Sequence, residues 1–293
     1  MTSQLIIGDC RKVLASLPGE SVDCCVTSPP YFGLRDYGKD GQIGLEQTPD
    51  VYVQELVGVF REVRRVLRND GTLWLNLGDS YSAGGRGGGA EGSIQSGNIG
   101  STTGVVFDAW KVPGFKPKNL LGIPWRVALA LQADGWYLRQ DIIWSKPNPM
   151  PESVTDRCTK AHEYIFLLSK SDRYYFNNEA IKEPSINEDV GGMRNKRSVW
   201  TVTTRPCREA HFATYPTDLI VPCILAGSKS DGVVLDPFNG AGTTGLVSLS
   251  NGRRYVGIEL NPDYAEISMR RFGLMATLVN LRDHEDCQRE VEI

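Results

Sequence analysis

The run Thr27-Ser28-Pro29-Pro30-Tyr31 combines residue types that could hold a flat polar ligand. It follows the apolar run Val-Asp-Cys-Cys-Val at 22–26, which predicts a buried strand that stops at Ser28. The two prolines fix φ and remove two backbone donors, so the Ser28 and Pro29 carbonyls and the Ser28 hydroxyl form a cluster of acceptors beside the Tyr31 ring. Such a pocket suits a flat group that presents NH2, such as a base rotated out of a duplex. The same residues are also compatible with a strand that ends at proline and buries a tyrosine.

A second candidate site lies at 233–245, Val-Val-Leu-Asp-Pro-Phe-Asn-Gly-Ala-Gly-Thr-Thr-Gly. The pattern predicts a strand, a glycine-rich turn and the start of a helix, and its last six residues fit the G-x-G-x-x-G pattern of a dinucleotide site. Asp236, however, would repel a pyrophosphate, whereas it would attract an ammonium and a sulfonium. Glu259, at the end of the next predicted strand, can accept hydrogen bonds from ribose hydroxyls in either case. The residues therefore favour S-adenosylmethionine over NAD, and a tight turn without a ligand is the third interpretation.

The elements that must position these residues alternate along the chain. Strands are expected at 4–9, 22–28, 72–77, 136–144, 164–168, 233–235 and 254–258, and helices at 11–17, 51–67, 123–133, 216–226, 243–250 and 262–275. This alternation predicts a largely parallel sheet with helices on both faces. Residues 84–104 contain nine glycines and predict a flexible loop.

Composition limits the classes of protein to consider. The 293 residues are 41% hydrophobic and 23% charged, as in a soluble globular protein, and neither a membrane helix nor a signal peptide is recognisable, so a cytoplasmic location is expected. Seven scattered cysteines without C-x-x-C predict reduced thiols, with no disulfide framework and no metal site. The net charge of −3 argues against wholesale non-specific binding of nucleic acid. One stretch, 194–208, is nevertheless basic and free of acidic residues, which suits phosphate contacts or an ordinary solvated face.

The two motifs occur with the shorter segments Gly8-Asp9-Cys10, Trp144-x-Lys146, 162–170 and 212–216. Together they resemble the β-class amino-methyltransferases of DNA, of the Ser-Pro-Pro-Tyr type, which modify cytosine N4 or adenine N6. The resemblance covers most of the chain. It implies a Rossmann-like S-adenosylmethionine-dependent methyltransferase fold, α/β, with a mostly parallel seven-stranded sheet and helices on both faces. The catalytic core would comprise 1–176 and 212–293 with a flexible insertion at 81–104, and 177–211 would form a target-recognition segment.

The resemblance also implies roles for individual residues. The target base would be held by Ser28, Pro29, Pro30 and Tyr31. The basic stretch, apart from the resemblance, suggests phosphate contacts by Arg194, Lys196, Arg197 and Arg205. The cofactor S-adenosyl-L-methionine would contact Asp9 through its adenine and Glu259 through its ribose. Its methionine end would be lined by Asp236, Phe238, Gly240 and Gly242, with Thr243 and Thr244 at the start of the following helix. Pro216 and Thr217 would complete the wall of the cofactor site. Accepting the amino hydrogens at Ser28 and Pro29 would localise the lone pair of the amine, and alignment of the two reactants can be worth ~7–11 kcal/mol.

These observations predict a site-specific DNA methyltransferase of the restriction-modification type. It would flip a base out of duplex DNA and transfer the methyl group directly to N4 of cytosine. Relatives that act on adenine usually carry Asp or Asn where this chain has Ser28, so Ser28 favours cytosine, and N6 of adenine is the alternative. An NAD-dependent oxidoreductase and a non-catalytic DNA-binding relative are the alternatives from other classes. Double-stranded DNA is the expected partner; a homodimer, a cognate restriction endonuclease and the recognition sequence are left open.

Overall fold

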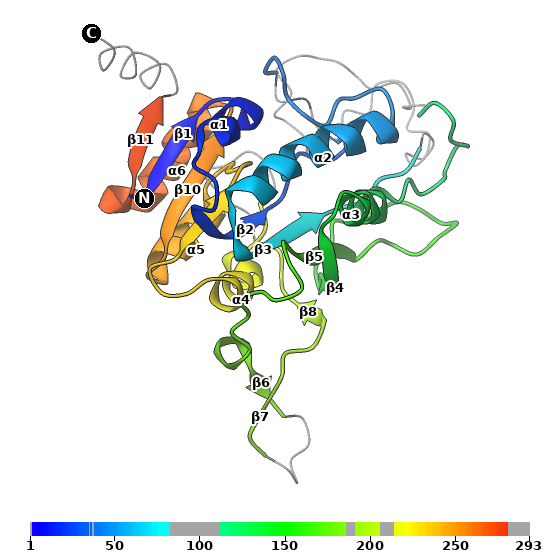
Figure 1. Ribbon diagram of the computed structural model, residues 1–293. Helices are drawn as coiled ribbons and strands as arrows, with labels where there is room; N and C mark the ends of the chain where they lie inside the picture. Colours follow the sequence, from blue (N-terminus) through cyan, green and yellow to red (C-terminus); the bar gives the residue numbers. More distant parts are fainter. Residues whose placement is uncertain are drawn as a thin grey trace.

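The computed structural model describes residues 2–34, 36, 38–82, 112–185, 191–205 and 214–280. Its main feature is a nine-stranded sheet with the strand order β11-β1-β10-β9-β2-β3-β5-β4-β8 (Figure 1). The expected flexible loop at 84–104 lies outside the described residues. The strands of the sheet are β1 (Gln4–Ile7), β2 (Val22–Thr27), β3 (Leu67–Leu77), β4 (Tyr137–Ser145), β5 (His162–Ser169), β8 (Val199–Thr201), β9 (Val233–Asp236), β10 (Arg254–Glu259) and β11 (Thr277–Asn280).

The sheet is mostly parallel, as predicted, but it is wider than the expected seven strands. Only β5 runs against its neighbours β3 and β4. The seven expected strands form the centre, and the additional strands β11 and β8 pair in parallel with the outer strands β1 and β4. β8 lies inside the segment 177–211, so part of that segment belongs to the sheet. The rest of its described part contains a short 3-10 helix (Glu179–Ile181) and the two-stranded ribbon β6 (Glu183–Pro184) and β7 (Met193–Arg194), which extends away from the sheet at the bottom of Figure 1.

Helices cover both faces, as predicted. One apolar cluster joins the sheet to α1 (Cys10–Ser16), α2 (Pro49–Val66) and α3 (Ile123–Ala133). A second cluster joins it to α4 (Thr217–Gly227), α5 (Thr243–Ser250) and α6 (Pro262–Phe272). The spacing of apolar residues explains why a helix packs on the sheet, as α2 shows. Its buried residues recur at helical spacing and so lie on one face: Tyr52, Leu56, Val59, Phe60, Val63 and Val66.

Two element boundaries differ from the prediction by three residues or more. β3 begins at Leu67, and the expected turn Asn69-Asp70-Gly71 lies within it as an irregularity: the pairing with β2 jumps from Val22↔Leu67 to Cys24↔Thr72. Because β3 pairs with β2 on both sides of the irregularity, the strand continues through residues whose sequence is typical of a turn. The last helix, α6, ends at Phe272 and is followed by a 3-10 turn, Gly273–Met275.

The topology brings the chemically interesting residues to one edge of the sheet. The parallel strands β1, β2, β9 and β10 all end at this edge, where Asp9, Ser28, Asp236 and Glu259 follow or close them. Because β5 is antiparallel, its beginning lies at the same edge and adds Glu163. In open α/β sheets this is where ligands bind. None of the described helices combines the length and the apolarity that a membrane span requires.

Candidate active site

A cavity of about 810 Å³ opens at this edge and is shared by both sequence motifs. Its volume is in the usual range for small-molecule sites. The structure thus brings together residues that are some two hundred positions apart in the chain. The cavity is lined by the predicted residues Asp9, Ser28, Pro29, Pro30, Tyr31, Arg205, Phe238, Gly240, Thr243 and Glu259, among others.

Asp236 has a different place from the one expected. Its carboxylate is 1% exposed and does not line the cavity. It accepts hydrogen bonds from the hydroxyls of Thr27 (2.6 Å) and Thr244 (2.6 Å), from the backbone N–H of Phe238 (3.0 Å) and from the hydroxyl of Tyr215 (3.3 Å). Burial raises the pKa of Asp236, although these donors oppose the shift. Asp236 therefore ties the end of β2 to the glycine-rich turn from behind the cavity wall.

The glycine-rich turn depends on backbone that only glycine adopts readily. Gly240 and Gly242 have φ of +53° and +79°. A Cβ at Gly242 would lie 2.7 Å from Phe272 Cζ and from Ser268 Oγ, so α6 packs directly on the turn. In the same turn, the Gly240 N–H donates to the neighbouring carboxylate of Glu259 at 2.7 Å.

Glu259 is the most strongly perturbed carboxyl group that lines the cavity. It accepts hydrogen bonds from the backbone N–H groups of Gly240 and Asn261 (2.8 Å). Burial nevertheless raises the pKa of Glu259 to about 7. A buried carboxylate with lone pairs left over suits ligand hydroxyls, because their hydrogen bonds would favour its ionised form.

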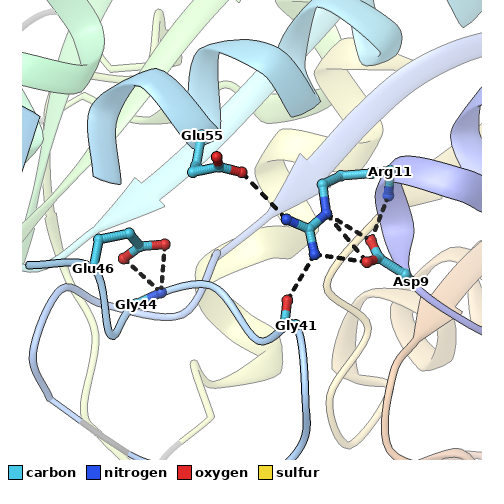
Figure 2. A network of polar contacts seen from close by, with 6 residues as sticks. All are labelled: Asp9, Arg11, Gly41, Gly44, Glu46 and Glu55. Carbon is cyan, nitrogen blue, oxygen red and sulfur yellow. Dashed lines mark hydrogen bonds and ion pairs between the residues drawn. The ribbon is translucent and has the colours of Figure 1, made fainter. Parts of the chain in front are cut away.

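Asp9 forms another part of the wall and is held by an arginine that the sequence reasoning did not single out (Figure 2). It caps α1 by accepting from Arg11 N (2.9 Å), and the Arg11 guanidinium contacts both carboxylate oxygens at 2.6–3.1 Å. The same guanidinium donates to the Gly41 carbonyl (2.8 Å) and to Glu55 of α2 (3.2 Å). Burial alone would raise the pKa of Asp9, but the hydrogen bonds and charge of Arg11 outweigh burial and keep this pKa below its ordinary value.

The loop that Arg11 holds follows the Pro-Pro-Tyr run directly. Its base is closed by the Gly33 N–H, which donates to the Gly44 carbonyl at 2.8 Å. The Gly44 N–H in turn donates to Glu46, whose nearer oxygen lies at 2.9 Å (Figure 2). The hydroxyl of Tyr52 in α2 donates to the Pro30 carbonyl at 2.8 Å. Hydrogen bonds therefore fix the loop that follows Tyr31 at its base, at Gly33 and Gly44, and at Gly41 beside Asp9.

Sequence reasoning missed three polar residues below the acceptor cluster: Asn76, Lys146 and Glu163. All three line the cavity. The Tyr31 hydroxyl donates to Glu163 at 2.7 Å, Asn76 Nδ2 donates to the Tyr31 hydroxyl at 2.6 Å, and the Lys146 ammonium pairs with Glu163. Lys146 and Glu163 lie in segments that carried the resemblance, but no local pattern links them to Tyr31, because the contact depends on the pairing of β3, β4 and β5.

Several predicted site residues lie outside the cavity. Pro216 is buried at the start of α4, and neither it nor Thr217 lines the cavity. The Thr244 side chain is fully buried against Asp236. Thr244 therefore supports the wall from behind, as Asp236 does.

The basic stretch is partly neutralised by acidic residues from outside it. Arg194 and Arg197 both pair with Glu183 of β6, at 3.0 and 3.1 Å. Arg205 pairs with Asp218 at 3.1 Å, and the Lys196 ammonium lies 5.0 Å from the centroid of the Trp200 ring. The absence of acidic residues from 194–208 in the sequence therefore overstates its free positive charge.

A mostly parallel sheet with helices on both faces, a glycine-rich turn after β9 and a carboxylate that closes β10 are the features of a Rossmann-like methyltransferase fold. The family model described as DNA methylase (N6/N4) matches residues 22–270. The chain belongs to this family of DNA methyltransferases.

Relatives and solved structures agree with this assignment. The chain is 54% identical to the Type II methyltransferase M.Cfr9I of Citrobacter freundii (91% of this chain, 86% of the relative). It is 51% identical to the Type II methyltransferase M.SmaI of Serratia marcescens (92% and 90%). The protein TTHA0409 of Thermus thermophilus, solved with S-adenosyl-L-methionine, matches with a TM-score of 0.63 at 26% identity (94% and 99%). The PvuII DNA methyltransferase, described as cytosine-N4-specific, has a similar fold, with a TM-score of 0.67 at 21% identity (93% and 87%).

Proposed function

We propose that this DNA methyltransferase transfers a methyl group to N4 of cytosine in duplex DNA, in the cytoplasm, with a cytosine that is flipped out of the helix. S-adenosyl-L-methionine is the methyl donor. The observation that carries the proposal is the single cavity in which the acceptor cluster of Ser28 and Pro29 faces the glycine-rich turn. N6 of adenine is the second candidate, because adenine also presents an amino group beside a ring nitrogen.

The wall of the cavity fits this cofactor. Asp9 and Glu259 provide carboxylate acceptors for an amino group and for ribose hydroxyls. When bound, the cofactor supplies an electrophilic methyl group on a sulfonium. A Cβ at Gly240 would meet only the Phe238 carbonyl oxygen within 4 Å, so the turn leaves room at its edge.

The residues after β2 would bind and orient the target base. Ser28 Oγ and the Pro29 carbonyl would accept the two amino hydrogens, which localises the nitrogen lone pair toward the methyl group. The Tyr31 ring would pack against the base. This ring is seated on Gly78, where a Cβ would lie within 2.9 Å of two of its atoms. A neutral Ser28 hydroxyl is consistent with cytosine, which is the basis for preferring N4.

The product decides between the two amino groups. The protein is incubated with S-adenosyl-L-methionine and mixed duplex DNA, and the digested product is analysed by mass spectrometry. We expect N4-methylcytosine in the wild type and at least a tenfold lower yield in Ser28→Ala, the scale of one lost hydrogen bond to the reacting group. N6-methyladenine as the sole product would refute the cytosine assignment. 5-Methylcytosine would overturn the catalytic proposal as a whole.

We also propose that the segment 177–211 contacts DNA. Its described part reaches the cavity: the Thr204 N–H donates to Asn148 Oδ1 at 2.9 Å, and the next residue, Arg205, lines the cavity mouth. Arg205→Ala should reduce the salt dependence of DNA binding by about one unit of slope for each phosphate that the arginine neutralises. The control is Arg173→Ala, an exposed arginine after β5 at the opposite edge of the sheet. Equal slopes for the two variants would place the DNA surface elsewhere.

Two further associations, which the sequence leaves open, can be tested. A homodimer would be detected by sedimentation of the purified protein. A cognate restriction endonuclease would be revealed if methylated DNA resists cleavage at the same sequence.

A further inference from the structure

Below the acceptor cluster, the side chains of Ser28, Tyr31, Asn76 and Glu163 form a continuous chain of hydrogen bonds. Ser28 Oγ and the Tyr31 hydroxyl are 3.3 Å apart, and the Tyr31 hydroxyl lies 2.7 Å from Glu163 Oε2. Asn76 Nδ2 donates to the Tyr31 hydroxyl at 2.6 Å and to Glu163 Oε2 at 2.9 Å. Glu163 therefore reaches Ser28 through Tyr31.

In this series of hydrogen bonds, which group donates and which accepts follows from counting protons. A carboxylate carries no proton and can only accept, and the Lys146 ammonium on its other oxygen stabilises it as an anion. Tyr31 has one hydroxyl proton, which goes to Glu163. Burial, together with the charge of Glu163, raises the pKa of Tyr31 well above its ordinary value, so Tyr31 keeps this proton.

The direction is passed on to Ser28. Because the Tyr31 proton is already donated, only Ser28 can donate between the two hydroxyls. The single proton of Ser28 is then turned toward Tyr31, and Oγ faces the cavity with lone pairs alone. Asn76 Oδ1 is a buried acceptor with no hydrogen-bond partner in the described part of the chain.

We propose that Glu163 determines which bases the site accepts: acting through Tyr31, it makes Ser28 an obligate acceptor, so a base with an exocyclic amino group fits and a base with a keto oxygen at that position does not. This role of Glu163 rests on the proposed function. A keto oxygen would face the Ser28 lone pairs without a proton between them, and a buried polar group without a partner is strongly disfavoured. Glu163 is a positioning residue, since it orders Ser28 through another side chain.

Glu163→Gln tests the direction of the chain. Lys146 can only donate, so it would take the amide oxygen and turn the amide NH2 toward Tyr31. Asn76 Nδ2, which donates to the same oxygen of Glu163, would lose that acceptor and keep its hydrogen bond to Tyr31. Tyr31 would then accept from the two amides and donate its proton to Ser28, which would turn the Ser28 proton into the cavity. We expect kcat for methylation to fall about tenfold or more, the effect of one misdirected hydrogen bond, with the cofactor Kd unchanged.

Base preference is the second readout. The probe is a duplex that carries either cytosine or uracil at the methylated position, once product mapping has located it. Wild type should bind the cytosine duplex more tightly than the uracil duplex. In Glu163→Gln the ratio of the two Kd values should fall about tenfold, the effect of one hydrogen bond. The charge-matched control is Glu62→Gln, which removes a carboxylate paired with Arg65 on α2 and should change neither readout.

A double-mutant cycle separates this role from simple stabilisation. Tyr31→Phe breaks the chain, so adding Glu163→Gln to it should change kcat less than twofold. Equal effects of Glu163→Gln with and without Tyr31, or an unchanged preference for cytosine over uracil, would overturn the proposal. If Glu163→Gln does not fold, Tyr31→Phe alone must still lower the preference. Failure of the wild type to methylate any amino group would instead refute the proposed function.

Discussion

Glu259 should make cofactor binding dependent on pH. Its pKa is raised to about 7 by burial, while the backbone N–H groups of Gly240 and Asn261 already favour the ionised carboxylate. Ribose hydroxyls that donate to Glu259 would favour the ionised form further. Cofactor binding should therefore lower the pKa of Glu259 and release a proton near neutral pH.

The size of the effect follows from that pKa of about 7. At pH 6 about nine-tenths of the Glu259 side chains would be protonated, and at pH 8 about one-tenth. If the ionised form binds preferentially, affinity should rise about tenfold from pH 6 to pH 8, or ~1.4 kcal/mol. Affinity thus increases as the pH rises through the pKa, because the group that must be charged loses its proton there.

Titration calorimetry at pH 6, 7 and 8 measures this dependence, with Glu259→Gln as the comparison. The amino group of the cofactor titrates in a neighbouring range, but it does so for both proteins and cancels in the ratio of their affinities. Glu46→Gln is the control: the pKa of Glu46 is also raised by burial, but Glu46 does not line the cavity. A ratio between wild type and Glu259→Gln that is constant with pH would refute the reasoning.

Two further predictions concern Asp9 in the cavity wall and the packing of α5 against α6. Arg11→Ala should weaken cofactor binding by about 1–3 kcal/mol, because Asp9 loses a charged partner. The control is Arg61→Ala, which breaks a similar pair with Asp134 outside the cavity and should leave the cofactor Kd unchanged. Equal losses of affinity by calorimetry would contradict this prediction. Gly245→Ala should lower the free energy of unfolding by about 1–3 kcal/mol, since its Cβ would lie 2.7 Å from Phe272 Cε1. At Gly58, in mid-helix with nothing within 4 Å of a Cβ, the same change should stabilise by up to about 1 kcal/mol, measured by denaturant unfolding; equal effects at the two sites would contradict the packing argument.

The sequence was most informative where a local pattern has a local cause. The apolar periodicity of α2 and the glycine-rich turn after β9 predicted these elements, because helix faces and left-handed turns constrain nearby residues. β8 and β11 have three and four residues, too few to show a period, and no motif follows them. Their pairing with β4 and β1 is what makes them strands. The equally short β1 and β9 were predicted because Gly8-Asp9 and the glycine-rich turn follow them.

The direction of side chains could not be predicted in this way. The sequence placed Asp236 at a strand end, but its donors Thr27, Thr244 and Tyr215 come from three other segments and turn the carboxylate away from the cavity. Likewise, Glu183 neutralises Arg194 and Arg197 only because β6 pairs with β7. The predicted roles of the individual site residues stay predictions until the variants are measured.

The position of β1 has a consequence for synthesis on the ribosome. Gln4–Ile7 emerge before the other strands of the sheet, yet both neighbours of β1, namely β10 and β11, lie some 250 residues later in the chain. At ~5–20 residues per second the first strand waits roughly 12–50 s for a partner. Until then its apolar face and both of its edges are open to chaperones or to other chains. Asp9 and Ser28 are likewise separated from Glu259 and the glycine-rich turn, so the nascent chain has no cofactor cavity. The enzyme becomes able to methylate DNA only once the last strands have joined the first.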